Sequence, residues 1–127
     1  MGVTALTYLF IGFGGILGAL LRFLLGKYIS GKVSGFPLGT LVINVTGSFA
    51  LSLLFFYFHG GQALNENVYL ALTTGVMGAY TTFSTFTYET LQLAQEGRAA
   101  AASAYLGGNV FLGIIGLLLG KLVANMI

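Results

Sequence analysis

Charged residues are so sparse along this chain that they leave four long uncharged segments between them. The segments run from Met1 to Leu21, from Leu38 to Phe58, from Asn67 to Tyr88 and from Ala99 to Gly120. Each is close to the roughly 20 residues that a helix needs to cross the hydrocarbon core of a bilayer. The pattern therefore predicts an all-α integral membrane protein with four transmembrane helices, and we expect residues 1–127 to form a single domain.

The composition supports a lipid bilayer as the environment and argues against other classes of function. Apolar residues make up 57% of the 127 residues and charged residues 6%, values far from those of a soluble domain. A net charge of +2 is too small to indicate nucleic acid as a partner. The chain has no cysteine, and its first two predicted helices contain no carboxylate. We therefore expect neither a thiolate metal site nor an enzyme.

The third segment changes character at Gly78 to Phe86, where it reads GAYTTFSTF. Glycine weakens a helix, and the hydroxyls of Thr81 and Thr82 can bond to backbone carbonyls. We therefore expect helix 3 to be broken near the bilayer midplane. Free carbonyls at such a break would attract a cation, and the new helix N-terminus would attract an anion. The alternative is an unbroken helix whose hydroxyls bond back to the preceding turn.

Aromatic rings and uncharged hydrogen-bond donors gather at membrane depth. Phe83 and Phe86 stand three residues apart and would share one helix face. The rim of a phenyl ring is electropositive, so two rings presented edge-on can stabilise a small anion without trapping it. Amide and hydroxyl donors at similar depth are Asn44, Ser84, Thr85, Tyr105 and Asn109. This set indicates a narrow pathway for a small, strongly hydrated anion, whereas the alternative role of the phenylalanines is packing or lipid contact.

Two further polar residues each have two interpretations from position alone. Asn44 lies inside an apolar span, where an amide is costly unless it is paired, so an interhelical hydrogen bond that fixes packing is one account. The other account is a direct part in the pathway. Arg22, near the end of helix 1, is either an anchor that snorkels to the membrane interface or part of the lining of an anion entrance.

The distribution of positive charge specifies the membrane orientation only weakly. With an even number of passages, both termini lie on one side, which has Lys121, and the opposite side has Lys27, Lys32 and Arg98. The positive-inside rule gives a slight preference on this basis. Insertion in both orientations followed by antiparallel dimerisation agrees with this distribution, as does a single, weakly specified topology.

Three stretches carry a resemblance to a known family: GGILGALLRF at Gly14 to Phe23, GTLVINVTGSF at Gly39 to Phe49, and GAYTTFSTFTYE at Gly78 to Glu89. They resemble the signature stretches of the Fluc (CrcB) family of small fluoride channels, and the resemblance covers the whole chain. It implies a fluoride-selective channel in the bacterial cell (inner) membrane, which lets fluoride leave the cytoplasm passively. It also implies a dual-topology antiparallel homodimer with two pores and a structural sodium ion at its centre.

The resemblance implies roles for individual residues as well. Phe83 and Phe86 would contact fluoride with their ring edges, and Asn44 would donate its amide beside them. Glu89 would lie near the far end of a polar track, and Arg22 would lie toward a vestibule. The remaining members of the track would be Thr40, Ser84, Thr85 and Tyr105.

The sodium ion implied by the resemblance would be held by backbone carbonyls of Gly78 and Thr81 from both chains. Two positions depart from the family pattern. Ala79 stands where a second glycine is common, which bears on the geometry of the sodium site, and Phe23 follows Arg22 where tyrosine is frequent. The residues expected to line the pore are all present.

Two other functions compete with a channel. A small dual-topology drug exporter has the same size, but it needs an acidic residue deep in the membrane, and Glu89 is the only candidate, near the end of helix 3. A non-transporting assembly partner would explain the glycine-rich helix faces. It would give no reason for the cluster of hydroxyls and phenylalanines at the midplane.

Overall fold

The computed structural model describes residues 4–61 and 64–127, and within these ranges the chain forms helices and no strand. Three helices are long: α1 (Ala5–Ser30), α2 (Leu38–His59) and α6 (Ala99–Ala124). Each of the three is apolar and long enough to cross a membrane. They confirm the first, second and fourth predicted helices, and each continues beyond the end of its uncharged segment, most of all α1, which runs past Leu21 to Ser30.

The third passage is interrupted, as the sequence predicts. It consists of α3 (Glu66–Leu70), a π-helix η1 (Ala71–Met77), a short α4 (Gly78–Tyr80) and, after a break, α5 (Ser84–Gln95). Residues 81–83 between α4 and α5 are not helical. The expected break is therefore confirmed, and the alternative of an unbroken third helix is wrong. The π-helical turns were not predicted.

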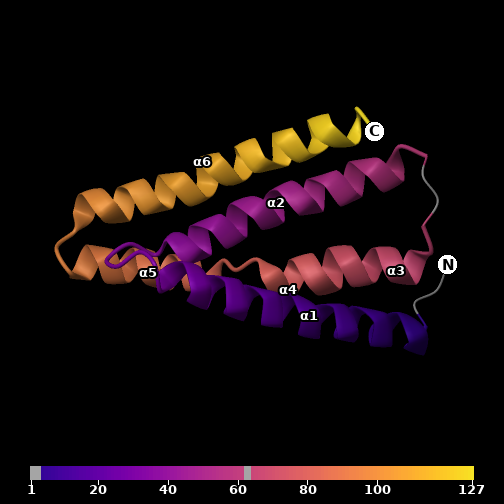
Figure 1. Ribbon diagram of the computed structural model, residues 1–127, viewed down its shortest axis with the longest axis horizontal. Helices are drawn as coiled ribbons and strands as arrows, with labels where there is room; N and C mark the ends of the chain where they lie inside the picture. The colour runs from indigo at the N-terminus through magenta and orange to yellow at the C-terminus, as the bar shows by residue number, and fades with distance from the viewer. Residues whose placement is uncertain (1–3, 62–63) are drawn as a thin grey trace.

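The four passages run in alternating directions (Figure 1). The first turn of α1 and the end of α6 lie at one end of the bundle, whereas the α1–α2 connection and the α5–α6 turn lie at the other. Helix α6 packs along α2, and α1 packs along η1 and α4. This is the arrangement that four membrane passages require, and it places the break of the third passage between α1 and α2.

Glycines bring α1 and the third passage into backbone contact. A Cβ atom on Gly14 would lie 2.2 Å from the carbonyl oxygen of Ala71, and one on Gly18 would lie 2.2 Å from that of Val76. Gly75 on η1 approaches the α1 backbone in turn, since a Cβ atom on it would lie 2.7 Å from the carbonyl oxygen of Ile11. Small residues allow such close approach of helices in a membrane, where packing replaces the hydrophobic effect between helices.

Helices α2 and α6 pack in the same way. A Cβ atom on Gly120 would lie 2.3 Å from the carbonyl oxygen of Phe49, and one on Gly116 would lie 2.8 Å from that of Val45. The hydroxyl of Ser52 donates a hydrogen bond of 2.7 Å to the carbonyl oxygen of Leu117. The glycines of the fourth predicted helix therefore serve close packing, as the sequence indicates.

The outside of the bundle is apolar. Phe13 on α1 and Phe111 on α6 have 68% and 69% of their surface exposed, and leucines and isoleucines surround them. A surface of this kind is unfavourable in water but matches the acyl chains of lipids. Together with the three long apolar helices, it identifies a multi-pass membrane protein.

Candidate ion pathway at the helix break

The break in the third passage is held by a side chain from another helix. Thr81 has extended backbone angles (φ −78°, ψ 159°), which end the helical path. The next residue, Thr82, has both its backbone N–H and its backbone carbonyl bonded by Asn44 of α2. The Thr82 N–H donates to Asn44 Oδ1 over 2.9 Å, and Asn44 Nδ2 donates to the Thr82 carbonyl over 3.0 Å. Asn44 thus replaces helical hydrogen bonds that the break removes.

These contacts change which carbonyls are available near the break. In a continuous helix, the Thr82 N–H would donate to the carbonyl of Gly78 and the Thr85 N–H to that of Thr81. Instead, the Thr82 N–H is bonded to Asn44, and the Thr85 N–H donates to the hydroxyl of Thr82 over 3.2 Å. The carbonyls of Gly78 and Thr81 have therefore lost their regular helical donors.

Arg22 of α1 reaches the same place. Its Nη1 donates to the Thr81 carbonyl over 3.4 Å, and the side chain is half-buried. The contact places the guanidinium of Arg22 at the helix break. Neither interpretation drawn from its position, the snorkelling anchor or the entrance lining, included this contact.

Asn44 is itself oriented by a second amide on α6. Its Nδ2 also donates to Asn109 Oδ1 over 2.8 Å, and Asn109 Nδ2 donates to the carbonyl of Tyr105, one turn earlier, over 3.0 Å. Both hydrogens of the Asn44 amide are thus directed at oxygens of this chain. The interhelical hydrogen bond, one of the two accounts of Asn44 that the sequence left open, is present.

A cavity of about 360 Å³, here called the phenylalanine pocket, opens beside the break. The rings of Phe83 and Phe86 meet edge to face there, with centroids 5.7 Å apart and an angle of 70° between their planes. Phe86 is 5% exposed and Phe83 is 76% exposed. The lining contains no charged residue and consists of Asn44, Gly47, Ser48, Leu51, Thr81, Thr82, Phe83, Phe86, Asn109, Val110 and Leu117.

Glu89 lies on the far side of Phe86, in a cluster with two hydroxyls. Thr40 of α2 donates to Glu89 Oε1 over 3.2 Å, and the buried hydroxyl of Tyr105 on α6 donates to Glu89 Oε2 over 2.5 Å. Each oxygen of the carboxyl group accepts a hydrogen bond, as suits a carboxylate. We call these three residues the carboxylate cluster. Three helices supply it.

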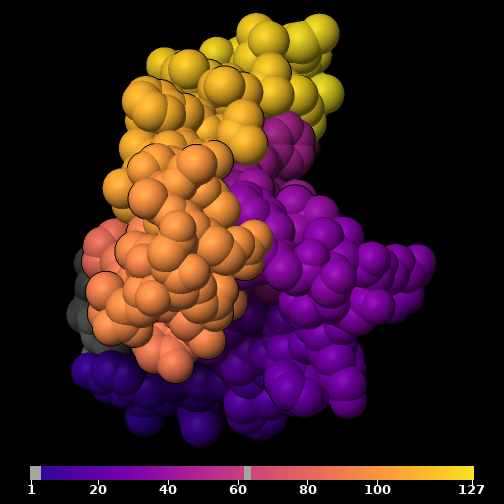
Figure 2. All heavy atoms as spheres, turned by 90° about the vertical axis from the view of Figure 1, so that its left-hand side faces the viewer, coloured from indigo at the N-terminus to yellow at the C-terminus, as the bar shows by residue number. Residues whose placement is uncertain are grey.

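A second cavity of about 340 Å³, the end pocket, lies beyond the carboxylate cluster. Figure 2 views this end of the molecule, where the α1–α2 connection, in purple, lies against α5, in orange. Aromatic rings join the two pockets: Phe86 contacts Tyr105 at 5.8 Å, and Tyr105 contacts Phe36 at 5.5 Å. The lining is Ser30, Val33, Ser34, Gly35, Phe36, Pro37, Glu89, Gln92, Leu93, Glu96 and Arg98.

The structure brings together most, but not all, of the residues expected at the site. Ser84 and Thr85 lie exposed on α5 and line neither pocket. Sequence reasoning missed Thr82, whose buried hydroxyl bonds to both the N–H and the hydroxyl of Thr85. The signal was available, because a threonine three residues before another polar residue at a helix start is typical of an N-terminal cap.

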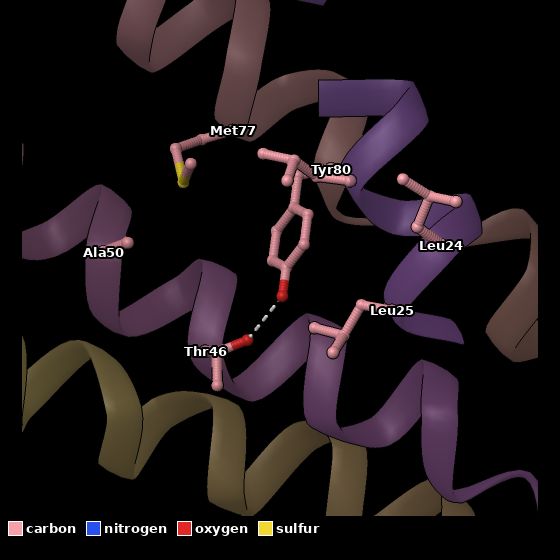
Figure 3. Close-up of a pocket in the computed structure, with 7 residues that line it drawn as sticks. Leu24, Leu25, Thr46, Ala50, Met77 and Tyr80 are labelled. Atoms are coloured by element: carbon pink, nitrogen blue, oxygen red, sulfur yellow. Dashed lines mark hydrogen bonds between the residues drawn. The ribbon is translucent and has the colours of Figure 1, made fainter. Parts of the chain in front are cut away.

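An apolar groove lies beside Tyr80 of α4, just before the break (Figure 3). Its volume is about 530 Å³, and the hydroxyl of Tyr80 contacts that of Thr46 over 2.9 Å within it. The remaining lining comes from α1, α2 and η1 and consists of Leu21, Leu24, Leu25, Ala50 and Met77. The groove therefore lies against the turns directly before the non-helical segment, whose residues line the phenylalanine pocket.

The carbonyl oxygen atoms at the break are ligands of the kind that a monovalent cation prefers. Within residues 4–61 and 64–127, no group of three or more histidine or acidic side chains could hold a metal ion. The carbonyls of Gly78 and Thr81, which lack their regular helical donors, stand at the C-terminal end of a half-helix. Such carbonyls coordinate sodium in broken membrane helices. The residues present therefore fit a sodium ion.

Comparisons with known proteins agree with the resemblance seen in the sequence. The family model described as "CrcB-like protein, Camphor Resistance (CrcB)" matches residues 9–121. Among curated relatives, a "Fluoride-specific ion channel FluC" of Acidobacterium capsulatum is 45% identical over 94% of this chain and 97% of its own length. "Fluoride-specific ion channel FluC 2" of Moorella thermoacetica is 46% identical over 94% and 98%, and the Thermotoga maritima protein is 42% identical over 91% and 95%. This chain belongs to the CrcB-like family.

Proposed function

We propose that this protein is a fluoride-selective ion channel that lets fluoride leave the cytoplasm passively through the bacterial cell (inner) membrane. The observation that carries the proposal is the phenylalanine pocket, a charge-free cavity lined by two phenyl rings and amide and hydroxyl groups beside a broken membrane helix. Relatives that align over nearly the whole chain are named fluoride-specific ion channels, which supports the choice of ion.

The chemistry of the pocket suits a small anion that must bind and leave again. The rims of Phe83 and Phe86 are electropositive and would stabilise fluoride without the strong attraction of a buried cation. We propose that the ion then passes Phe86 toward the carboxylate cluster. There the hydroxyls of Thr40 and Tyr105, which donate to Glu89, would donate to fluoride in turn before it reaches the end pocket.

Ser84 and Thr85 belong to the proposed polar track only through a second copy of the chain. Both are exposed on α5 beside Phe83, whose ring is also exposed. We propose an antiparallel homodimer in which a second copy covers the groove of Figure 3 and lies beside this face. Two pores would result, and the weak charge asymmetry between the two ends of the chain supports dual insertion.

We propose a structural sodium ion where the two copies meet. The Gly78 and Thr81 carbonyls of each copy would hold it, and a bound sodium ion would supply a fixed positive charge at the dimer centre. Arg22, which contacts the Thr81 carbonyl, would lie at the boundary between this site and a vestibule. We also propose that residues 1–127 form a single domain.

The membrane potential alone would drive export. Hydrogen fluoride enters cells as a neutral acid and ionises in the cytoplasm, where the anion is trapped. An inside-negative potential favours exit of a monovalent anion by about 2.3 kcal/mol per 100 mV. A channel of this kind needs neither ATP nor proton coupling, so we expect no enzymatic activity.

The test is anion efflux from liposomes that contain the purified protein and potassium fluoride or potassium chloride. Valinomycin carries potassium out with the anion, so that no opposing membrane potential builds up. Ion-selective electrodes then follow the release of each anion. We expect rapid fluoride release, little chloride release, and loss of fluoride release in Phe83→Ile and Phe86→Ile variants. The matched control is Phe111→Ile, because Phe111 is an exposed phenylalanine on α6 outside the lining of the phenylalanine pocket.

Three outcomes would contradict the proposal or part of it. Equal release of chloride and fluoride would exclude a selective channel. Retention of fluoride by the wild-type protein would favour a coupled exporter or an assembly partner instead. Equal losses in the Phe111→Ile control and the pocket variants would show that the phenylalanines act through folding.

A further inference from the structure

We propose that Asn44 is a positioning residue that holds the third passage open and thereby frees the Gly78 carbonyl. The effect on helix geometry follows from this chain alone. Its consequence for sodium rests on the proposed function. The inference concerns one side-chain amide from α2 and the backbone N–H and carbonyl of one residue of the break.

The first step is the complementarity between the Asn44 amide and the backbone N–H and carbonyl of Thr82. An amide side chain has one acceptor and one donor group side by side. The backbone N–H and carbonyl of a single residue, which belong to two successive peptide groups, offer the complementary donor and acceptor. Asn44 uses both against Thr82, at 2.9 Å and 3.0 Å. A leucine in its place would leave a buried N–H and a carbonyl unpaired in the membrane, which is costly.

The second step is what the Thr82 N–H does when Asn44 is absent. Its nearest alternative acceptor in a helical path is the Gly78 carbonyl, four residues earlier. Rewinding of the break would satisfy the N–H and occupy the Gly78 oxygen together. Asn44 therefore decides whether that oxygen is free.

The third step is the occupancy of the Asn44 donors. One hydrogen of Nδ2 is directed at the Thr82 carbonyl and the other at Asn109 Oδ1, and Asn109 is anchored to the Tyr105 carbonyl. A passing anion would have to displace one of these acceptors to receive a hydrogen bond from Asn44. The chain from Tyr105 through Asn109 to Asn44 thus fixes the amide orientation that Thr82 needs.

The direct test is the ¹³C chemical shift of the Gly78 carbonyl in protein labelled with ¹³C-carbonyl glycine and ¹⁵N alanine. The chain contains two Gly-Ala pairs, Gly18–Ala19 and Gly78–Ala79, so the first, inside α1, is an internal reference. An Ala19→Val variant assigns the two signals. Hydrogen bonding deshields a carbonyl carbon, so the Gly78 shift reports on the state of its oxygen.

The Gly78 signal is compared among three variants in solutions without sodium. In Asn44→Leu, we expect the Gly78 signal to move downfield, because the Thr82 N–H returns to that carbonyl. Asn44→Asp retains an acceptor for the Thr82 N–H and should leave the signal at the wild-type position. Ser52→Ala removes an interhelical hydrogen bond of the same helix and should also leave it unchanged. A Gly78 signal that is unchanged in Asn44→Leu, or moved in Asn44→Asp, would overturn the proposal.

Sodium chloride is then added in place of N-methylglucamine chloride. We expect the Gly78 signal to respond to sodium in the wild type and in Ser52→Ala, and to lose the response in Asn44→Leu. A sodium response that persists in Asn44→Leu would overturn the link between Asn44 and the cation. Absence of a response in the wild type would instead contradict the sodium site of the proposed function, while the sodium-free shifts would still decide the role of Asn44.

Discussion

Gly47 of α2 faces Thr81 so closely that a Cβ atom on the glycine would lie 2.3 Å from Cγ2 of the threonine. The ring of Tyr80 is the next neighbour, at 3.0 Å. The segment where the third passage breaks therefore rests directly on the α2 backbone. This close packing is sensitive to a single methyl group, since real Cβ atoms are not found at such distances.

We predict that Gly47→Ala reduces fluoride efflux at least tenfold, because Thr81 must move and the phenylalanine pocket with it. Thr81→Ser removes the clashing methyl group and keeps the hydroxyl that donates to the Met77 carbonyl. The double variant should therefore recover part of the flux, with the contact to Tyr80 limiting the recovery. Liposome efflux of the two single variants and the double variant measures this. Additive losses in the double variant would contradict the assigned clash.

A second prediction concerns the contact between α1 and η1. Gly18→Ala places a Cβ atom 2.2 Å from the Val76 carbonyl oxygen, in contact with backbone that cannot rotate away. Overpacking typically costs about 1–3 kcal/mol, so the melting temperature of the purified protein should fall clearly. Gly15→Ala is the matched control, because nothing lies within 4 Å of its Cβ position. Equal melting temperatures for the two variants would show that α1 does not pack on η1 in this way.

Much of the fold could be predicted from the spacing of charged residues, because an uncharged, apolar segment of about 20 residues typically forms a membrane helix. The break could be predicted as well, since Gly78 and the following threonines weaken a helix locally. The π-helical turns could not. They depend on how η1 packs against Gly14 and Gly18 of α1, which is a property of two helices and not of one pattern.

The site was predictable in its residue types more than in its contacts. Thr40, Glu89 and Tyr105 come together as the resemblance to the family suggested, although no spacing in the sequence relates them. The partner of Asn44 depends on the register between α2 and the third passage, so sequence indicated only that a partner must exist. The contact between Arg22 and Thr81 could not be predicted either, because it depends on the register between α1 and the third passage.

A third prediction tests the carboxylate cluster through stability. Tyr105→Phe removes the donor to Glu89 Oε2 and should lower the free energy of unfolding by about 1.5–3 kcal/mol, the usual contribution of a hydrogen bond to a charged group. In a Glu89→Gln background the loss should be smaller, because the acceptor is then neutral. Unfolding of the detergent-solubilised protein gives both values. Tyr88→Phe, on the exposed face of α5, is the control and should be neutral; equal losses in both backgrounds would exclude the charged pair.

The last prediction concerns Arg22 and rests on the proposed sodium site. The guanidinium donates to the Thr81 carbonyl over 3.4 Å, so its positive charge opposes a cation on the same oxygen. Even at an effective dielectric constant of about 20, unit charges a few ångströms apart repel by several kcal/mol. Arg22→Gln should therefore lower the sodium concentration for half-maximal fluoride efflux by on the order of tenfold, which is about 1.4 kcal/mol.

The control for Arg22 is Arg98→Gln, which removes an equal charge at the α5–α6 turn, where Arg98 pairs with Glu96 over 3.5 Å. That variant should leave the sodium dependence unchanged, because exposed charges far from the break are screened. A sodium requirement that rises in Arg22→Gln would mean that Arg22 holds the Thr81 carbonyl in position for the ion. In that case geometry, and not repulsion, would govern how α1 acts on the break.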